Sequence, residues 1–438
     1  MSWRFRRKPS NDARVATPCA ARLRRNLVTA VAALACALPF AREAQAAKSH
    51  YAFAVIAGTI QSADDEPASQ RLFKAVGLDR RISFVVYDGN FKSPAEPCSD
   101  ALFARRQQLL ESSRAPLVFI PGQHDWADCA TAEGGGYDVA ERLDFLRQTV
   151  FADNTTMGPS PIALTRESDV ARFHSYRENV RWQFADTVFV GLDVVSGNNH
   201  YLNAGGRNGE FDDRAIATAF WLEHAAEYAK RRAAHALVVI IEADPNFKRY
   251  ERADRFAWLK FDRARDGYLE FKRSLVKAAQ IFHGPIILIH GQAHALPGGF
   301  SIDQPLFNDK GVRLANLTRI AIAPRERSTQ WIQFDVDFDR QPPFRVSEKA
   351  VPKNLPAPPA LPHQEPAAPP APGTPGLMPP IPAEPAEPGA PASEPPLLPE
   401  PKDNTPPTSS MPAPPNPTAT PTRDSAAPAS RVSVQGGG

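Results

Sequence analysis

The stretch Leu117-Val-Phe-Ile-Pro-Gly-Gln-His-Asp-Trp-Ala-Asp-Cys129 decides how this chain is interpreted. It begins as an apolar run that suits a buried strand and passes through Pro121-Gly122 into a polar segment of the kind found at hairpin tips. Loops at strand ends carry the reactive groups of many α/β enzymes, because the strand is rigid and the loop is accessible. We therefore expect the chemistry of this protein at the end of this strand.

Residues 1–46 have the organisation of a secretory signal peptide. An arginine-rich segment precedes the apolar run Leu27–Phe40, and Ala44-Gln-Ala46 is a small-residue pattern that suits cleavage. The alternative is an uncleaved membrane anchor, but about 14 apolar residues are fewer than the roughly 20 that a spanning helix needs. Arg24-Arg25 and Cys36 are weaker hints of a twin-arginine signal and a lipid-attached cysteine. We expect an exported protein, periplasmic or secreted.

The charge of the expected mature chain argues against a nucleic-acid partner. The whole sequence has 51 Lys and Arg and 48 Asp and Glu, which gives a formal net charge of +3. Residues 1–46 hold nine of the basic and two of the acidic side chains, so the chain without them carries −4. Binding to phosphate backbones needs a clustered excess of positive charge.

Two of the four cysteines, Cys98 and Cys129, lie outside the expected leader. In an exported protein, two cysteines most simply form one disulfide. Closing a loop of this size would stabilise the fold by about 3–4 kcal/mol in the chain-entropy model. The rival interpretation is a pair of metal-binding thiolates, but two single cysteines lack the usual paired spacing.

Apolar strands alternate with amphipathic helices between residues 50 and 348. Strands are expected at residues 51–57, 82–87, 116–120, 188–190, 236–241, 285–289, 317–322 and 329–336, the last two as closing antiparallel strands. Helices are expected at residues 67–76, 101–112, 138–151, 212–234 and 267–281, the fourth capped by Asp212-Asp213. This alternation is typical of an α/β domain whose site lies along the strand ends.

The composition changes at about residue 349, where the domain is expected to end. Of the 45 prolines, 28 lie between residues 351 and 428. Such a segment cannot bury a core, so residues 349–438 are expected to form a disordered tail with polyproline II character. The simpler interpretation is a spacer or cell-wall stalk, and the alternative is a docking site for a proline-binding partner protein.

Five polar turns follow apolar strands along the chain. They are Gly58-Thr-Ile-Gln61, Gly89-Asn-Phe-Lys92, Gly122-Gln-His-Asp125, Glu242 and Gly291-Gln-Ala-His294. Their order and spacing resemble the signature of the calcineurin-like metallophosphoesterases, which runs Asp-x-His, Gly-Asp-x-x-Asp, Gly-Asn-His-Asp or Glu, a single His, and Gly-His-x-His. The third turn is most similar to an exported subgroup that reads Pro-Gly-Asp-Asn-Glu-Trp-x-Asp-Cys, because Trp126, Asp128 and Cys129 stand at the same positions.

The resemblance covers about residues 50–340, and Arg177–Trp182 and Ser196–Asn199 also look like that subgroup. It implies a four-layer sandwich in which two mixed β-sheets are flanked by helices. It also implies hydrolysis of a phosphorylated small molecule or envelope component by two divalent cations (Mn, Fe, Zn or Mg), which polarise the phosphoester and activate a bridging water.

Several ligand positions that the resemblance implies carry other residues in this chain. Thr59 and Gln61 stand where Asp and His should bind the first metal, and Asn90 stands in place of the bridging Asp. The other implied metal positions are Gln123, which replaces Asn, Glu242 and Gln292, which each replace His, and His294, which matches. Hard divalent cations are held mainly by carboxylates, imidazoles and water. We therefore do not expect tight two-metal binding, whereas a single cation bound by some of these residues remains open.

The pair His124-Asp125 matches the family signature. The resemblance implies that His124 donates a proton to the phosphate or leaving group while Asp125 orients its ring. The alternative is a structural histidine bonded to a neighbouring carboxylate. Of the nearby residues, His290 is expected to be a buried core histidine, and Lys92 either faces phosphate or, as the simpler case, is a solvated surface lysine.

Two functions of different classes follow. The first is a metal-dependent phosphoester hydrolase of this family whose activity is weakened or lost. The second is a non-catalytic envelope binding protein that uses the former active-site pocket. A third interpretation, in which the folded part only presents the proline-rich tail to the cell wall, is distinguished by deleting the tail.

Overall fold

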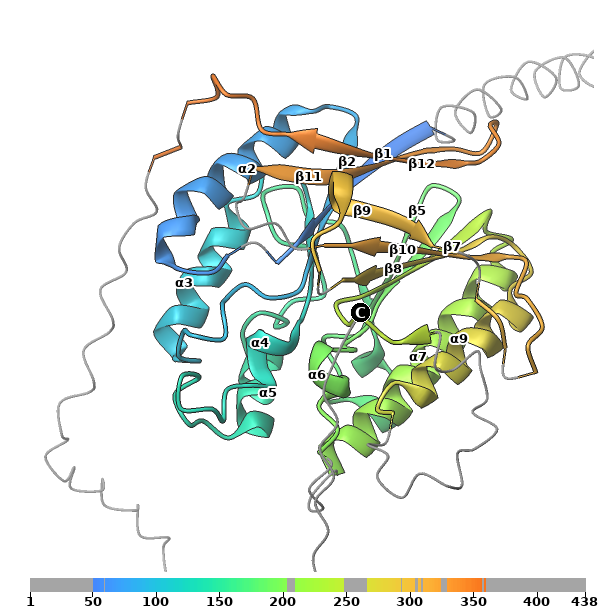
Figure 1. Ribbon diagram of the computed structural model, residues 1–438, viewed down its shortest axis with the longest axis horizontal. Coiled ribbons are helices and arrows are strands. Elements are labelled where there is room, and N and C mark those ends of the chain that lie inside the picture. The colour runs from blue at the N-terminus through green and yellow to red at the C-terminus, as the bar shows by residue number, and fades with distance from the viewer. Residues whose placement is uncertain are drawn as a thin grey trace, which may run out of the picture. The chain divides into compact units, whose positions relative to one another are not determined.

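Two β-sheets lie face to face between two layers of helices in the computed structural model (Figure 1). The structure describes residues 50–58, 60–202, 209–247, 266–292, 294–303, 306–308, 310–323, 329–356 and 358–359. The expected leader, Thr59 and the greater part of the proline-rich tail lie outside the described residues.

The first sheet has five strands in the order β12-β11-β1-β2-β3. β1 (His50–Ala57), β2 (Ile82–Asp88) and β3 (Leu117–Ile120) are parallel neighbours. β11 (Gln330–Asp337) runs antiparallel to β1, and β12 (Phe344–Ala350) runs antiparallel to β11. Because β1, β2 and β3 are parallel, the first three polar turns leave the sheet at the same edge.

The second sheet has seven strands in the order β4-β5-β6-β7-β8-β10-β9. Four neighbours are parallel, namely β6 (Thr187–Gly191), β7 (Ala236–Ile241), β8 (Ile286–Gly291) and β10 (Leu317–Ile322). Antiparallel strands close both edges, with β4 (Thr165–Arg166) and β5 (Val180–Phe184) beside β6 and β9 (Phe300–Asp303) beside β10.

The outer helices cover the two sheets from opposite sides (Figure 1). On the first sheet lie α2 (Glu66–Leu78), α3 (Asp100–Glu111) and α5 (Val139–Gln148), and on the second lie α7 (Gly209–Arg231) and α9 (Leu269–Ile281). Short helical turns complete the described chain: η1 (Ala63–Asp65), α4 (Gln123–Trp126), η2 (Glu167–Asp169), η3 (Ala171–Phe173), α6 (Ser196–Asn199) and η5 (Pro297–Gly299).

Three hydrophobic clusters account for the layered order. One lies between the first sheet and its helices, one between the second sheet and its helices, and the third between the sheets. In the third cluster, the Phe53 ring is centred 4.7 Å from Phe334 and 5.3 Å from Phe84 in stacked pairs. Each apolar strand is therefore buried on both faces, which explains its uninterrupted hydrophobic sequence. The expected two-sheet α/β fold is confirmed.

Three local expectations were wrong. β10 is parallel to β8 rather than part of an antiparallel closing pair, although it does pair antiparallel with β9. Helix α7 already includes residues 209–211, so Asp212 lies within its first turn and does not cap it. The segment after Gly122 forms the short helix α4 rather than a hairpin tip, because Asp125 accepts backbone hydrogen bonds that close a helical turn.

The fold continues beyond the expected boundary at residue 348. Strand β12 runs to Ala350, and the Val351 N–H donates to the Thr329 carbonyl at 2.8 Å. Arg71 on α2 then donates to the Pro352 and Lys353 carbonyls at 3.2 and 2.7 Å. The first residues of the proline-rich segment are therefore held against α2.

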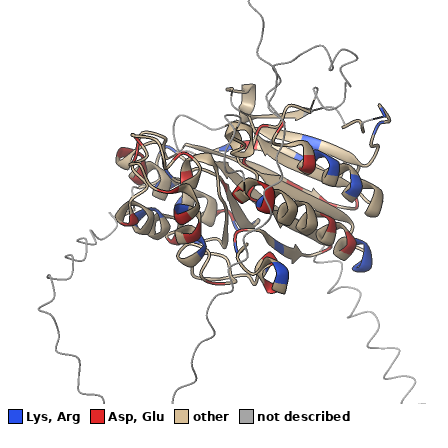
Figure 2. Cartoon of the chain, turned by 90° about the horizontal axis from the view of Figure 1, so that it is seen from below, with Lys and Arg blue, Asp and Glu red and all other residues tan. Residues whose placement is uncertain are grey.

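Both acidic and basic residues lie on the outer helices, as Figure 2 shows. Among the residues that the structure describes, no helix is long and apolar enough to cross a membrane.

Candidate functional site

The strand-end turns meet at one edge of the sandwich, where their backbones are in direct contact. A Cβ atom added to Gly89 would lie 2.2 Å from Cγ of Glu242, and one added to Gly122 would lie 2.6 Å from Oδ1 of Asn90. A Cβ added to Gly291 would lie 2.0 Å from the Glu242 carbonyl oxygen. Only glycine permits these approaches. The second, third, fourth and fifth turns therefore form one site.

Asn90 joins three of these turns. Its backbone has a positive φ of 53°, which asparagine tolerates better than most residues. Its Nδ2 donates to Oε1 of Glu242 at 2.9 Å, and its Oδ1 accepts from the His124 N–H at 2.8 Å. The other oxygen of Glu242 accepts from the Ser196 N–H at 2.7 Å. Both polar atoms of the Asn90 amide are thus engaged within the protein.

Asp125 supports the loop rather than the histidine ring. Its fully buried carboxylate accepts backbone N–H groups of Gly122 at 2.8 Å, Asn90 at 2.9 Å and Phe91 at 2.8 Å. Burial raises the pKa of Asp125 to about 7, while hydrogen bonds from Gly122 and Phe91 favour the charged form. The expected orientation of His124 by Asp125 is therefore not observed.

The ring of His124 pairs with Asp128 instead. Its Nδ1 lies 2.5 Å from Oδ2 of Asp128, and its side chain is 28% exposed. The two residues are four apart in sequence, and α4 brings them together across one helical turn. A partly exposed imidazole held by a carboxylate is suited to proton transfer.

Lys92 is buried and not a solvated surface lysine. Its Nζ donates to the carbonyls of Ser93 and His124, both at 2.8 Å, and lies 3.8 Å from Oδ1 of Asp128. Burial lowers the pKa of Lys92, and the nearby Asp128 and Asp125 oppose this shift. Lys92 therefore helps to position the His124–Asp128 pair, because its Nζ contacts the backbone of His124 and the carboxylate of Asp128.

A disulfide holds the end of this loop. Cys98 and Cys129 are bonded, with Cα atoms 5.6 Å apart, as the cysteine count predicts. The rival interpretation, two metal-binding thiolates, is wrong because both sulfurs are used in the bond. The bond places α3's leading segment next to Asp128, which is adjacent to Cys129 in sequence.

The turn after β6 completes the site. A Cβ atom on Gly197 would lie 2.8 Å from Nε2 of Gln123, so this turn rests on the third one. The Trp126 indole N–H donates to Oδ1 of Asp193 at 3.3 Å, and the Arg214 guanidinium lies 4.8 Å from the Trp126 ring centre. Trp126 thus links the loop to α7 and to the second sheet.

The other predicted site residues are bonded elsewhere, exposed to solvent, buried in the core, or outside the described residues. Nε2 of Gln292 donates to Oδ2 of Asp244 at 3.0 Å, so the Gln292 amide is bonded to a carboxylate that follows β7. His294 and Gln61 are exposed, and Thr59 lies outside the described residues. His290 is buried, with Nδ1 2.8 Å from the Gly291 carbonyl oxygen, so its expected place in the core is confirmed.

Asp88 is a site residue that the sequence interpretation missed. It is the last residue of β2, its side chain is 3% exposed, and its Oδ1 has no hydrogen-bond partner among the described residues. Burial, reinforced by the charge of Glu242, raises the pKa of Asp88 well above its usual range. An aspartate that closes an otherwise apolar strand was the available signal.

The side chains at this edge do not fit the two-cation centre that the sequence resemblance implies. Asn90, in the bridging position, has no charge and both amide atoms are hydrogen-bonded. Gln292 is turned to Asp244 and His294 is exposed. Two dications need several converging carboxylates or imidazoles to offset their mutual repulsion. The described residues do not supply them.

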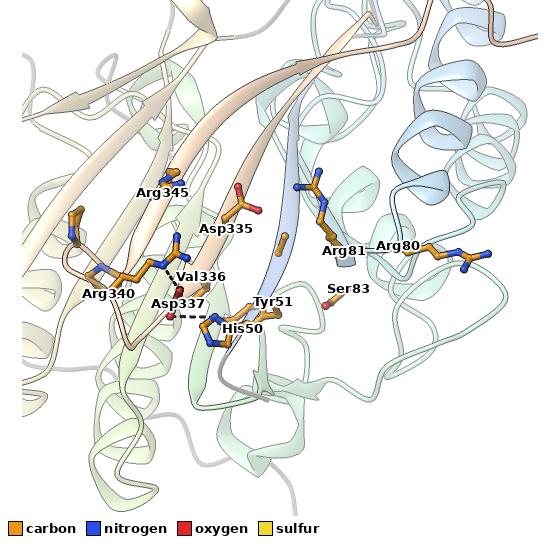
Figure 3. A pocket seen from close by; sticks show the side chains of 13 residues that line it. His50, Tyr51, Arg80, Arg81, Ser83, Asp335, Val336, Asp337, Arg340 and Arg345 are labelled. Atoms are coloured by element: carbon orange, nitrogen blue, oxygen red, sulfur yellow. Dashed lines mark ion pairs between the residues drawn. The ribbon is translucent and has the colours of Figure 1, made fainter. Parts of the chain in front are cut away.

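A cleft of about 530 Å³ lies at the opposite end of the first sheet, where β1 and β2 begin (Figure 3). Its charges are largely matched within the protein. Arg81 donates to Asp79 at 2.7 Å, Arg340 lies 2.7 Å from Asp337, and Nδ1 of His50 lies 3.2 Å from Asp337. Because the strand-end turns are far from these residues along the strands, we place the candidate site at the other end.

No family model matches the chain, and no curated protein matches it. Two solved structures resemble it at low identity. A purple acid phosphatase isolated from yellow lupin (Lupinus luteus) seeds is 11% identical, covers 69% of this chain and 54% of its own, and has a TM-score of 0.35. GAP50, the anchor in the inner membrane complex of Plasmodium, is 10% identical, covers 71% and 87%, and has a TM-score of 0.38. This chain spans about half the length of the lupin phosphatase.

Proposed function

We propose that this protein is an exported member of the calcineurin-like phosphoesterase family in which phosphoester hydrolysis is weakened or lost. The observation that carries the proposal is the convergence of the strand-end turns with Asn90 bonded between Glu242 and His124. The order of the turns matches the family signature, and the amide occupies the place of a charged ligand.

The residues that remain suit only part of the family chemistry. The His124–Asp128 pair is partly exposed and suits proton donation to a leaving group. Activation of the attacking water is the missing part, because a bound metal ion can lower the pKa of its water from 15.7 to about 7. An uncharged amide at the bridging position gives no comparable effect, so we expect slow turnover at best.

The test is turnover of p-nitrophenyl phosphate by the purified chain beginning at residue 47, with and without added Mn²⁺. We expect a rate far below the roughly 10 s⁻¹ that is typical of enzymes. Any residual rate should fall in His124→Ala and persist in the matched control His174→Ala, whose side chain is exposed and which lies in none of the strand-end turns. A Mn²⁺-dependent rate near 10 s⁻¹, equal in both variants and wild type, would contradict the proposal.

A further inference from the structure

The two sheets each end in an edge strand on the same side of the sandwich (Figure 1). β12 is the last strand of the first sheet and β9 is the last strand of the second, and each has one neighbouring strand among the described residues. Near Glu348, η5 covers the seam between them, because a Cβ atom on Gly298 would lie 3.7 Å from Oε2 of Glu348. An edge strand of this kind can pair with a further extended chain.

A groove of about 460 Å³, which we call the edge groove, lies between the two edge strands where β12 begins. It is lined by residues of β12, of the turn before β12 and of β9, namely Phe344, Arg345, Val346, Arg340, Gln341, Pro342 and Ile302. Phe344 and Val346 are part of the packing between the sheets, whereas Ile302 is 57% exposed. Sites that bind ligands have volumes of about 300–1,000 Å³. The edge groove is large enough for such a role and combines apolar walls with two arginines.

The two faces of β12 differ in chemistry. Side chains alternate along a strand, so Phe344 and Val346 face the second sheet and Arg345 faces outward. The exposed guanidinium of Arg345 forms no ion pair or hydrogen bond with the residues that the structure describes. Asp335 stands opposite Arg345 in register on β11, but its Oδ1 accepts from Nε2 of Gln333 at 2.8 Å. Arg345 therefore keeps its hydrogen-bond donors for another molecule.

These faces specify the chain that fits the edge of β12. A strand added to this edge would place alternate side chains on the same two faces. Its inward side chains would enter the edge groove against Ile302, so apolar residues suit these positions. Its outward side chains would lie beside Arg345 and Lys349, so acidic residues suit them and basic residues are repelled.

We propose that the outer edge of β12 binds an extended segment of a partner protein in which apolar and acidic residues alternate. Phe344 pairs with Val336, which in turn pairs with Tyr51 near the start of β1. The edge groove therefore lies at the opposite end of the sheet from the strand-end turns. The proposal goes beyond the proposed function, because it concerns a protein partner and requires no hydrolysis.

The experiment measures binding of fluorescein-labelled peptides to the chain beginning at residue 47 by fluorescence anisotropy. The probe is a peptide as long as β12, which has 7 residues, in which valine and glutamate alternate. One control peptide has lysine in place of glutamate, and the other has the composition of the probe with its valines in one block. We expect saturable binding of the probe and about tenfold weaker binding of both controls.

Matched substitutions of exposed residues test the two faces. Arg345→Glu should weaken binding of the probe about tenfold and strengthen binding of the valine–lysine peptide, because the charge beside the added strand is reversed. The control Arg114→Glu makes the same change on an exposed arginine next to β3, at the other edge of the first sheet, and should bind like wild type. Ile302→Ser should weaken binding about tenfold, whereas Val312→Ser, at a residue that is 58% exposed, should not.

Amide hydrogen exchange shows where the peptide binds. Strand addition should slow exchange within Phe344–Ala350 when the probe is present and leave exchange in β4, an edge strand of the second sheet, unchanged. Slowed exchange elsewhere, with none in β12, would overturn the proposal even if the probe binds.

The binding measurements can overturn the proposal in three further ways. Folded wild type could fail to bind the probe, as expected if the basic residues only keep β12 from pairing with other copies. The three peptides could bind equally. Binding could stay unchanged in Arg345→Glu or in Ile302→Ser when circular dichroism shows that the variant is folded. None of these outcomes bears on the proposed function, since turnover is measured separately.

Discussion

The Asn90 side chain forms a hydrogen-bonded bridge between two turns, and a single substitution tests this bridge. In Asn90→Asp, a carboxylate would face Oε1 of Glu242 instead of donating to it. Aspartate also tolerates the positive φ, so the change is mainly electrostatic. We expect a loss of about 2–3 kcal/mol in the free energy of unfolding at pH 7 from urea denaturation.

The matched control is Asn154→Asp, which makes the same change on an exposed residue and should leave stability unchanged. The loss in Asn90→Asp should shrink near pH 4, where protonation of either carboxyl restores a donor. Equal urea midpoints for Asn90→Asp and wild type at pH 7 would show that the amide bridge does not support the fold.

Glu167 provides a pH test away from the site. It is fully buried, accepts from Nδ2 of Asn179 at 2.8 Å, and has an Oε1 without a partner among the described residues. Burial raises its pKa from 4.5 to about 9. The folded protein therefore keeps a proton that the unfolded chain releases between these values, so the stability contributed by Glu167 falls as pH rises through this window.

In Glu167→Gln, the neutral amide imitates the protonated carboxyl of Glu167 at every pH. We expect its free energy of unfolding to exceed that of wild type by about 1–3 kcal/mol at pH 8 and to match it near pH 5, measured by urea denaturation. The exposed Glu270→Gln is the control and should follow wild type at both values. A difference that is the same at pH 5 and pH 8 would contradict the assigned protonation.

At the scale of elements, the disulfide loop is the clearest case for a stability measurement. Cys98 and Cys129 are separated by 31 residues and connect the start of α3 to the end of the His124 loop. Replacing both by alanine should cost about 3–4 kcal/mol by the loop-entropy relation. The measurement is urea denaturation, compared with wild type in dithiothreitol. If the reduced wild type keeps the oxidised midpoint, the bond does not restrict the unfolded chain.

Long buried strands were predictable because their sequences are continuously apolar. The runs at β1, β2, β3, β7, β8 and β10 stand between turn residues and agree with the structure to within one or two residues. β12, β9 and β5 were missed because their sequences alternate polar and apolar residues, and β4 because it has only two residues. Local periodicity does not distinguish such strands from loops.

The site could be predicted in position but not in its contacts. Glycine before the polar residue marked four of the five turns, and the turns do meet. The partners of each side chain depend on distant strands. The sequence therefore did not reveal that Asp128, and not Asp125, pairs with the His124 ring. The buried Lys92 was missed for the same reason, because a lysine in a turn is exposed unless packing encloses it.

At the scale of the whole molecule, the described contacts define where the folded part ends. Val351 and Leu355 pack against the cluster between the first sheet and its helices, and Arg71 and Lys74 donate to carbonyls of residues 352, 353 and 356. The test compares the urea unfolding midpoints of three chains that begin at residue 47 and end at residues 350, 359 and 438.

The chain ending at 359 should unfold at the same urea midpoint as the one ending at 438, because a proline-rich sequence of low hydrophobicity adds little buried surface. The chain ending at 350 should lose about 1–3 kcal/mol, since it lacks two apolar contacts and the carbonyls that Arg71 and Lys74 bind. Equal midpoints for 350 and 359 would mean that these surface contacts contribute nothing. A lower midpoint for 359 than for 438 would assign a stabilising role to the proline-rich segment. The expected order places the end of the folded unit at residues 351–359, beyond the point where the composition of the sequence changes.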